Sequence, residues 1–182
     1  VRVNCPDENE INNLKEKTIL VGMFNSINNE KKISEILKKN IKIFSLELLP
    51  RITRAQSMDV LSSQSNLAGY RAVVDSIYEF EKAIPMMMTA AGTVPAAKVL
   101  IIGAGVAGLQ AIATAKRLGA IVSATDVRAA SKEQVESLGG KFLTVDQSED
   151  LETSSGYAKE VSEEYKKKQS EMMREALKKN DI

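Results

Sequence analysis

One short stretch of the sequence has the spacing of a phosphate-binding turn. Residues 103–108 read Gly-Ala-Gly-Val-Ala-Gly, directly after a continuous apolar run and directly before a helical pattern that opens at Val106. In that context Gly103 permits a tight turn, Gly105 lets the backbone approach a pyrophosphate, and Gly108 allows close packing of the helix on the strand. The free N–H groups at the start of the helix would face the phosphates. The motif therefore predicts a dinucleotide site.

A carboxylate stands where such a site needs one. Asp126 follows the next apolar run, and a carboxylate at that point accepts hydrogen bonds from the ribose hydroxyls of the adenosine half. It also repels a 2′-phosphate, which favours NAD(H) over NADP(H), although Arg128 two residues later works against that preference. We predict an NAD(H) site built from the glycine turn with Asp126, Val127 and Arg128. The alternative is that the glycines serve close packing alone.

The composition excludes several kinds of chemistry. The 182 residues contain no histidine and a single cysteine, so imidazole acid–base catalysis, a histidine-activated nucleophile and a histidine metal site are excluded, and we expect no metal site. A net charge of +1 provides no field to attract nucleic acid, so we expect no nucleic-acid partner. Hydride transfer between two nicotinamides needs no proton acceptor, and a chain without histidine is compatible with it.

The first third of the chain predicts a small α/β lobe. Its apolar and charged segments alternate, which predicts strands at 1–4, 18–24 and 41–46 and an amphipathic helix at 30–39. Alternating strands and helices favour a parallel sheet. A single helix cannot cover both faces of such a sheet, so we expect this lobe to be incomplete.

One long helix should follow, and then a hairpin. Residues 58–82 contain no proline and repeat apolar side chains mostly at steps of three and four, and Pro85 ends the pattern. The apolar stretch 86–95 predicts a short hairpin that turns near Gly92. Two interpretations of this hairpin remain open, packing within the chain or contact between two copies.

The glycine turn then lies in a second lobe. The pattern predicts strands at 98–102, 120–125 and 141–145 and helices at 106–118, 130–138 and 157–180, the last as a solvated helix. The expected fold class is α/β, with two Rossmann-like lobes of parallel sheets flanked by helices, joined by a long helix and both incomplete. We expect domains at 1–57 and 86–182, with the connecting helix at 58–85.

Three segments, taken with the glycine turn, resemble one family. They are the run that opens Arg-Ile-Thr-Arg-Ala-Gln-Ser-Met-Asp at Arg51, residues 86–95 (MMMTAAGTVP) and residues 124–130 (ATDVRAA). Together they resemble the alpha subunit of proton-translocating NAD(P) transhydrogenase, in its peripheral NAD(H)-binding component. The match is dense from about residue 46 to residue 168.

The resemblance implies a function and partners. This chain would bind NAD(H) and present NADH for direct hydride transfer to NADP+, which is bound on a partner component. The partners would be an NADP(H)-binding component and a membrane proton channel, and the chain would form a homodimer, with the hairpin at 86–95 as a candidate contact. The expected location is cytoplasmic, with peripheral attachment to the inner membrane through those components.

The resemblance also assigns residues. It places Arg51, Gln56 and Asp59 at the nicotinamide end, as the catalytic loop that faces the partner's nucleotide. The same stretch of the chain adds cofactor contacts from Ile52, Thr53, Arg54 and Ser62. A loop that closes over bound NAD(H) in the family is matched from Gly156 and Tyr157 onward.

Length is where the sequence departs from the family, whose members carry about as much sequence again. We therefore expect a fragment truncated at both ends, which is either one piece of a split subunit or the product of a decaying gene. Two further functions stay open, a noncatalytic NAD-binding or scaffold fragment and an NAD-dependent oxidoreductase like alanine dehydrogenase. The loop from Arg51 to Asp59 favours transhydrogenase over the latter.

Overall fold

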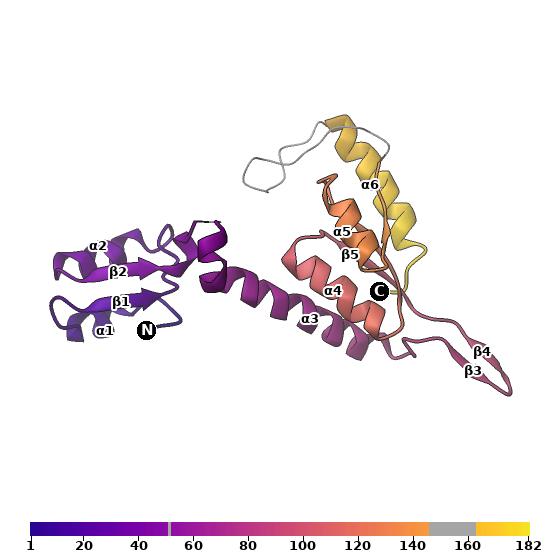
Figure 1. Ribbon diagram of the computed structural model, residues 1–182, viewed down its shortest axis with the longest axis horizontal. Helices are drawn as coiled ribbons and strands as arrows, with labels where there is room; N and C mark the ends of the chain where they lie inside the picture. Colours follow the sequence, from indigo (N-terminus) through magenta and orange to yellow (C-terminus); the bar gives the residue numbers. More distant parts are fainter. Residues whose placement is uncertain (51, 146–162) are drawn as a thin grey trace. The chain divides into compact units, whose positions relative to one another are not determined.

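The computed structural model describes residues 1–50, 52–145 and 163–182. It divides into two compact units, Val1–Ser63 and Gln64–Ile182 (Figure 1). The long helix α3 (Val60–Phe80) begins in the first unit and runs on into the second. Within the described ranges, no helix is long and apolar enough to span a bilayer.

The first unit is a small parallel α/β arrangement. Its elements are α1 (Glu8–Asn13), β1 (Ile19–Gly22), α2 (Glu30–Lys38), β2 (Lys42–Ser45) and the short 3₁₀ turns η1 (Leu46–Leu48) and η2 (Thr53–Met58). Strands β1 and β2 pair in parallel, from Ile19 opposite Lys42 to Gly22 opposite Ser45. The helices bury one apolar face on them, and the core is formed by Ile11, Leu20, Phe24, Ile36 and Ile41.

Two details of this unit differ from the sequence prediction. The strand expected at 1–4 is reduced to one bridge, in which the Arg2 N–H donates to the Val21 carbonyl oxygen over 2.8 Å. Pro6 has no N–H to continue a ladder, and Asp7 already caps a helix. That helix, α1, was not predicted, although Asp7 and Glu10 form a reciprocal capping box.

The ends of the two strands are held together by one buried acceptor. The Glu47 carboxylate accepts hydrogen bonds from the backbone N–H of Phe24 at 3.2 Å and from the N–H and hydroxyl of Ser26 at 3.0 Å. Burial alone would raise the Glu47 pKa, but these hydrogen bonds outweigh it and hold the pKa below its ordinary value. Glu47 is therefore a structural carboxylate of the loop that follows β1.

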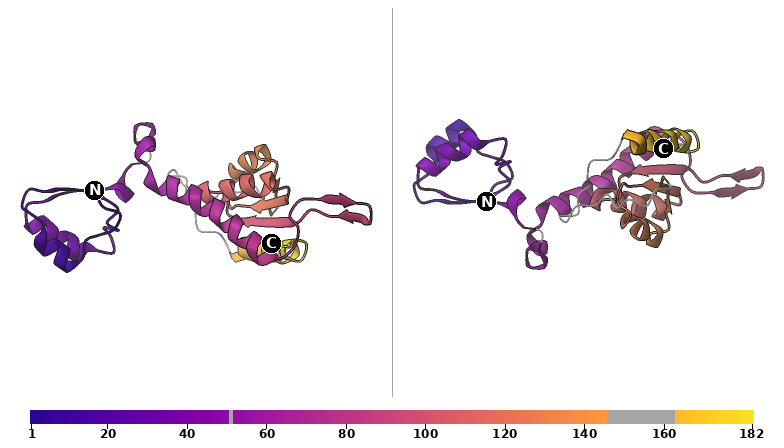
Figure 2. Two further views of the ribbon diagram at one scale, coloured as in Figure 1. Left: turned by 90° about the horizontal axis from the view of Figure 1, so that it is seen from below. Right: turned by 90° about the horizontal axis from the view of Figure 1, so that it is seen from above.

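The second unit contains a separate hairpin and a three-stranded parallel sheet. The hairpin is β3 (Met87–Thr89) with β4 (Gly92–Val94), and the sheet has the order β5-β6-β7. The strands and helices of the sheet layer are β5 (Lys98–Ile102), α4 (Val106–Arg117), β6 (Ile121–Thr125), α5 (Ser131–Ser137), β7 (Lys141–Phe142) and α6 (Glu163–Leu177). In both views of Figure 2, α4 and α5 (pink and orange) lie on one side of the sheet and α6 (yellow) on the other. The expected α/β class is confirmed.

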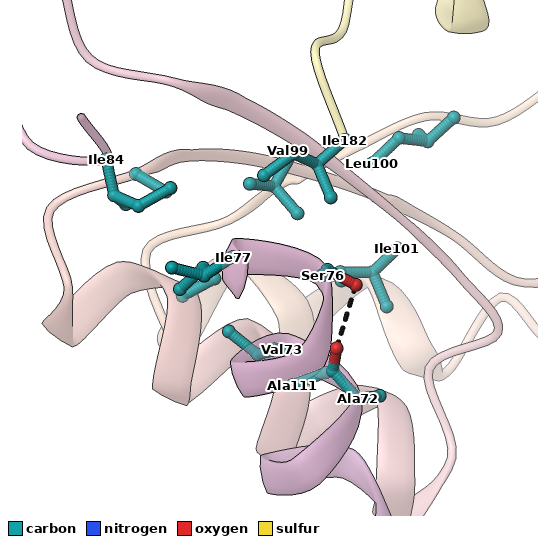
Figure 3. Close-up of a pocket in the computed structure, with 12 residues that line it drawn as sticks. Ala72, Val73, Ser76, Ile77, Ile84, Val99, Leu100, Ile101, Ala111 and Ile182 are labelled. Carbon is teal, nitrogen blue, oxygen red and sulfur yellow. Dashed lines mark hydrogen bonds between the residues drawn. The ribbon is translucent and has the colours of Figure 1, made fainter. Parts of the chain in front are cut away.

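Helix α3 packs against α4 and the edge strand of this sheet. A Cβ atom on Gly69 would stand 2.0 Å from the Ala107 carbonyl oxygen, so the two helices meet at a point where only glycine fits. Further along, α3 and β5 enclose a small apolar cavity of about 90 Å³ that Val73, Ile77 and Val99 help to line (Figure 3). The residues 180–182 run beside β5, where the Leu100 N–H donates to the Ile182 carbonyl oxygen over 2.7 Å.

Most of the long helix is less buried than its apolar pattern suggests. Val73 is buried, but Leu67, Tyr70 and Tyr78 are 59%, 51% and 82% exposed. The hairpin is exposed along its whole length, with Met88 81% accessible. The described residues of this unit thus leave apolar side chains uncovered on both elements.

Candidate functional site

The glycine turn lies between the end of β5 and the start of α4. Gly103 adopts a positive φ of 91°, which glycine tolerates best, and its N–H donates to the Thr125 carbonyl oxygen over 2.8 Å. That bond ties the turn to the end of β6. Gly105 is the N-cap of α4 and has no side chain to cap the helix, so the first turn of α4 presents backbone N–H groups at this edge.

The second and third glycines have different surroundings. A Cβ atom on Gly105 would have as its nearest neighbour the Arg128 Nη2 atom at 4.0 Å, so the backbone there is open. A Cβ atom on Gly108 would stand 1.8 Å from the Gly103 carbonyl oxygen. Gly108 is therefore needed for packing of α4 on the turn, and Gly105 is the point where another molecule can approach the main chain.

Asp126 follows β6 and turns its carboxylate back toward this turn. Its Oδ2 atom accepts from the Ala104 N–H over 2.7 Å, and its Oδ1 atom accepts from the Arg128 N–H over 2.8 Å. The side chain is only 7% exposed. Burial would raise the Asp126 pKa, but the hydrogen bonds from the Arg128 side chain and from the two backbone groups outweigh it, and the pKa lies below its ordinary value. Asp126 is therefore ionised and rigidly held at neutral pH.

Arg128 forms a two-pronged ion pair with the same carboxylate. Its Nε donates to Oδ1 of Asp126 over 2.9 Å and its Nη2 donates to Oδ2 over 3.0 Å. The Arg128 side chain is 22% exposed. The guanidinium consequently covers the carboxylate on the side that faces the glycine turn.

These residues line a cavity of about 560 Å³ at the carboxyl ends of β5 and β6. Such a volume is in the range of small-molecule sites, and this edge of an open parallel sheet is where such folds bind ligands. One wall comes from the strand ends and the loop after β6. The opposite wall comes from α6, through Lys166, Gln169, Ser170 and Met173.

The contribution of α6 was not foreseen. The sequence indicated a solvated helix, yet Gln169 and Met173 are half-buried against this cavity. The four lining positions follow the spacing of a single helix face, at steps of three, one and three. That spacing is the signal that could have identified them.

The loop expected at the nicotinamide end belongs to the first unit. It forms the turn η2, in which Thr53, Arg54 and Gln56 are exposed, as is Ile52 just before it. Asp59 precedes α3, and its carboxylate accepts from the Ser62 N–H over 2.9 Å and from the Ser62 hydroxyl over 2.6 Å. Asp59 and Ser62 thus cap the long helix.

The structure groups some of the predicted residues. Gly103, Asp126, Val127 and Arg128 line one cavity, and Gly105, Val106 and Gly108 form the turn and helix start beside it. Gln56, Asp59 and Ser62 belong to the other compact unit. Arg51, Gly156 and Tyr157 lie outside the described residues.

Comparison with known proteins adds independent information. Family models described as alanine dehydrogenase/PNT match twice, the N-terminal domain over residues 1–68 and the C-terminal domain over residues 72–182. An NAD(P) transhydrogenase subunit alpha of Rhodospirillum rubrum is 61% identical over 175 residues, which are 95% of this chain and 46% of that protein. An alanine dehydrogenase of Staphylococcus epidermidis is 30% identical over 149 residues, which are 80% of this chain and 40% of that protein.

Solved structures agree with this result. The crystal structure of transhydrogenase from Sinorhizobium meliloti superposes with a TM-score of 0.87 at 52% identity, covering 100% of this chain and 48% of that one. The chain thus spans about half the length of the relatives it matches. An L-alanine dehydrogenase structure, at 22% identity and a TM-score of 0.61, shares the fold. The resemblance to transhydrogenase alpha subunits is confirmed, and the chain belongs to the alanine dehydrogenase/PNT family.

Proposed function

We propose that this chain carries the NAD(H) site of a proton-translocating transhydrogenase and presents NADH for hydride transfer to NADP+ on a partner component. One observation carries the nucleotide site. The Asp126 carboxylate is fixed by two backbone N–H groups beside the open main chain of Gly105. A preset acceptor next to a helix start suits a ribose with its attached pyrophosphate.

In this proposal each element of the turn has one task. The pyrophosphate lies over Gly103, Gly105 and the first turn of α4 from Val106, while Gly108 keeps that helix close to the strand. Asp126 accepts the ribose hydroxyls of the adenosine half, and Val127 and Arg128 border it. Ionised Asp126 repels a 2′-phosphate, so NADH should bind more tightly than NADPH.

The reaction proposed for the complete assembly is a hydride exchange. A hydride leaves C4 of the NADH nicotinamide and bonds to C4 of the NADP+ nicotinamide, which gives NAD+ and NADPH with no proton released to a side chain. The absence of histidine from the chain is compatible with this step. We assign Arg51, Gln56 and Asp59 to the nicotinamide end, with Ile52, Thr53, Arg54 and Ser62 beside them. Gly156 and Tyr157 are proposed to begin the closing loop.

The partners follow from the same proposal. An NADP(H)-binding component must hold the acceptor nucleotide, and a membrane component must conduct the protons, which places this chain at the cytoplasmic face of the inner membrane. A homodimer is proposed through the hairpin, because Met86, Met87 and Met88 are 61%, 44% and 81% exposed on it. The domain division we propose remains 1–57, 58–85 and 86–182.

Two measurements test the function. Titration of the full chain with NADH and NADPH tests the site, and NADPH binding as tight as NADH would contradict the role of Asp126. Hydride exchange between NADH and an NADP+ analogue, with the NADP(H)-binding component added, tests the reaction. If no exchange occurs even after a chain with the remaining segments of the subunit is added, the chain is a noncatalytic nucleotide-binding fragment.

Alanine dehydrogenase activity is the less favoured alternative. The transhydrogenase relative is 61% identical to this chain and the alanine dehydrogenase is 30% identical. Oxidation of alanine also requires a group that accepts a proton from the substrate. Assays with alanine and NAD+, and with pyruvate, ammonium and NADH, should therefore show no turnover.

A further inference from the structure

The Arg128 guanidinium lies where the adenosine ribose is proposed to bind. It bonds to both oxygens of Asp126, at 2.9 and 3.0 Å, and its Nη2 atom is 4.0 Å from the position of a Cβ on Gly105. It therefore lies between the carboxylate that would accept the ribose and the main chain that would face the phosphates. A nucleotide cannot use both features while the guanidinium stays in this place.

The acceptor positions of Asp126 support the same conclusion. Two carboxylate oxygens offer about four lone-pair sites. Four N–H donors occupy them here, two from the backbone of Ala104 and Arg128 and two from the Arg128 guanidinium. If the guanidinium leaves, two sites open, which matches the 2′ and 3′ hydroxyls of one ribose. The backbone N–H groups remain and keep the carboxylate in position.

We propose that Arg128 is an internal competitor for the ribose-binding carboxylate and sets nucleotide selectivity. This inference rests on the NAD(H) site proposed above. NADH has to displace the guanidinium from Asp126, which weakens NADH binding. The displaced guanidinium stays near the 2′ position of the ribose, where it offsets the charge of Asp126 and pairs with the 2′-phosphate of NADPH. Arg128 thus reduces the discrimination between the two nucleotides from both directions.

The test is Arg128→Ala in the full chain, with NADH and NADPH titrated separately by calorimetry at one salt concentration. We expect the dissociation constant for NADH to fall about tenfold, since a charge-assisted pair no longer has to break. We expect the constant for NADPH to rise about tenfold, because Asp126 then faces the 2′-phosphate without a counter-charge. Arg128→Lys keeps the charge but loses the two-pronged geometry, so its two constants should lie between those of the wild type and Arg128→Ala.

Arg117→Ala is the matched control. Arg117 is exposed at the end of α4, and its substitution removes the same charge from the same unit. Both nucleotide constants should stay unchanged in this variant, and thermal melting of all variants reports whether the fold is kept. If Arg128→Ala is unfolded at the assay temperature, the constants of Arg128→Lys decide.

The possible results separate this inference from the function beneath it. If the wild type binds NADH and Arg128→Ala binds it equally well or more weakly, the competitor role is overturned and the NAD(H) site stands. An equal loss for both nucleotides indicates a purely structural role and also overturns it. If no protein in the series binds NADH, the nucleotide site itself is contradicted.

Discussion

Two alanine substitutions in the glycine turn should have opposite effects, and we expect to separate binding from folding with them. Gly105→Ala adds a methyl group where the nearest atom is 4.0 Å away, at a φ of −77° that alanine adopts readily. The folded state meets no clash, and the unfolded chain loses freedom. We expect a gain of about 0.4 to 1 kcal/mol in the free energy of unfolding. The methyl group, however, stands on the surface that a pyrophosphate must approach.

Gly108→Ala should do the reverse. Its methyl carbon would stand 1.8 Å from the Gly103 carbonyl oxygen, far inside any normal contact, so the start of α4 has to move away from the turn by about 1 Å. Overpacking of this kind costs about 1 to 3 kcal/mol. For a chain of this size about 2 kcal/mol lowers the melting temperature by about 4 to 8 °C.

The assay is thermal melting combined with NADH titration on both variants. Gly105→Ala should melt at or slightly above the wild-type temperature and bind NADH at least about tenfold more weakly, which is about 1.4 kcal/mol. Gly108→Ala should melt earlier, and its binding should fall because the whole turn is displaced. Unchanged NADH affinity in Gly105→Ala would refute the pyrophosphate position. Wild-type stability in Gly108→Ala would refute the packing argument.

Three further predictions concern single contacts. The pKa of Asp126 lies below its ordinary 3.8, so its stabilising contribution is complete above about pH 4 and is lost as the pH falls through the lower folded value; Asp126→Asn should flatten the acid limb of a stability–pH curve. Gly69→Ala places a methyl group 2.0 Å from the Ala107 oxygen and should destabilise the second unit by about 1 to 3 kcal/mol in urea unfolding, whereas Ala68→Gly beside it, on an exposed position, should cost about 1 kcal/mol at most. Asp59→Ala removes the two bonds from Ser62 and should cost about 0.5 to 2 kcal/mol, measured by the same method.

Local signals made much of the second unit predictable. The apolar strand, the three glycines and the helical spacing after Val106 identify the turn because each requirement is met within a few residues. The same applies to Asp126, which stands directly after β6. In contrast, helix α1 has six residues and too short a repeat to be recognised by periodicity, and only the Asp7–Glu10 capping box indicates it.

Other features of the site depend on three-dimensional packing. The ion pair of Arg128 with Asp126 depends on one rotamer among many, and a sequence spacing of two does not specify it. The α6 wall was missed because Lys166, Gln169 and Ser170 are polar, as solvated residues are. Polarity alone cannot distinguish a face that meets solvent from one that lines a polar cavity.

The groups around the cavity also limit its chemistry. Among the described residues that line it, the titratable side chains are Asp126, Arg128 and Lys166. Asp126 has a lowered pKa and is ionised at neutral pH, with hydrogen bonds at both oxygens, so it is a poor proton acceptor. Arg128 does not lose its proton in proteins, and Lys166 is paired with Glu163 at 2.7 Å. Such a set can hold a ribose and a phosphate but is not suited to accept a proton from an alcohol or an amine, which favours a site that binds the nucleotide and leaves the reaction to its nicotinamide end.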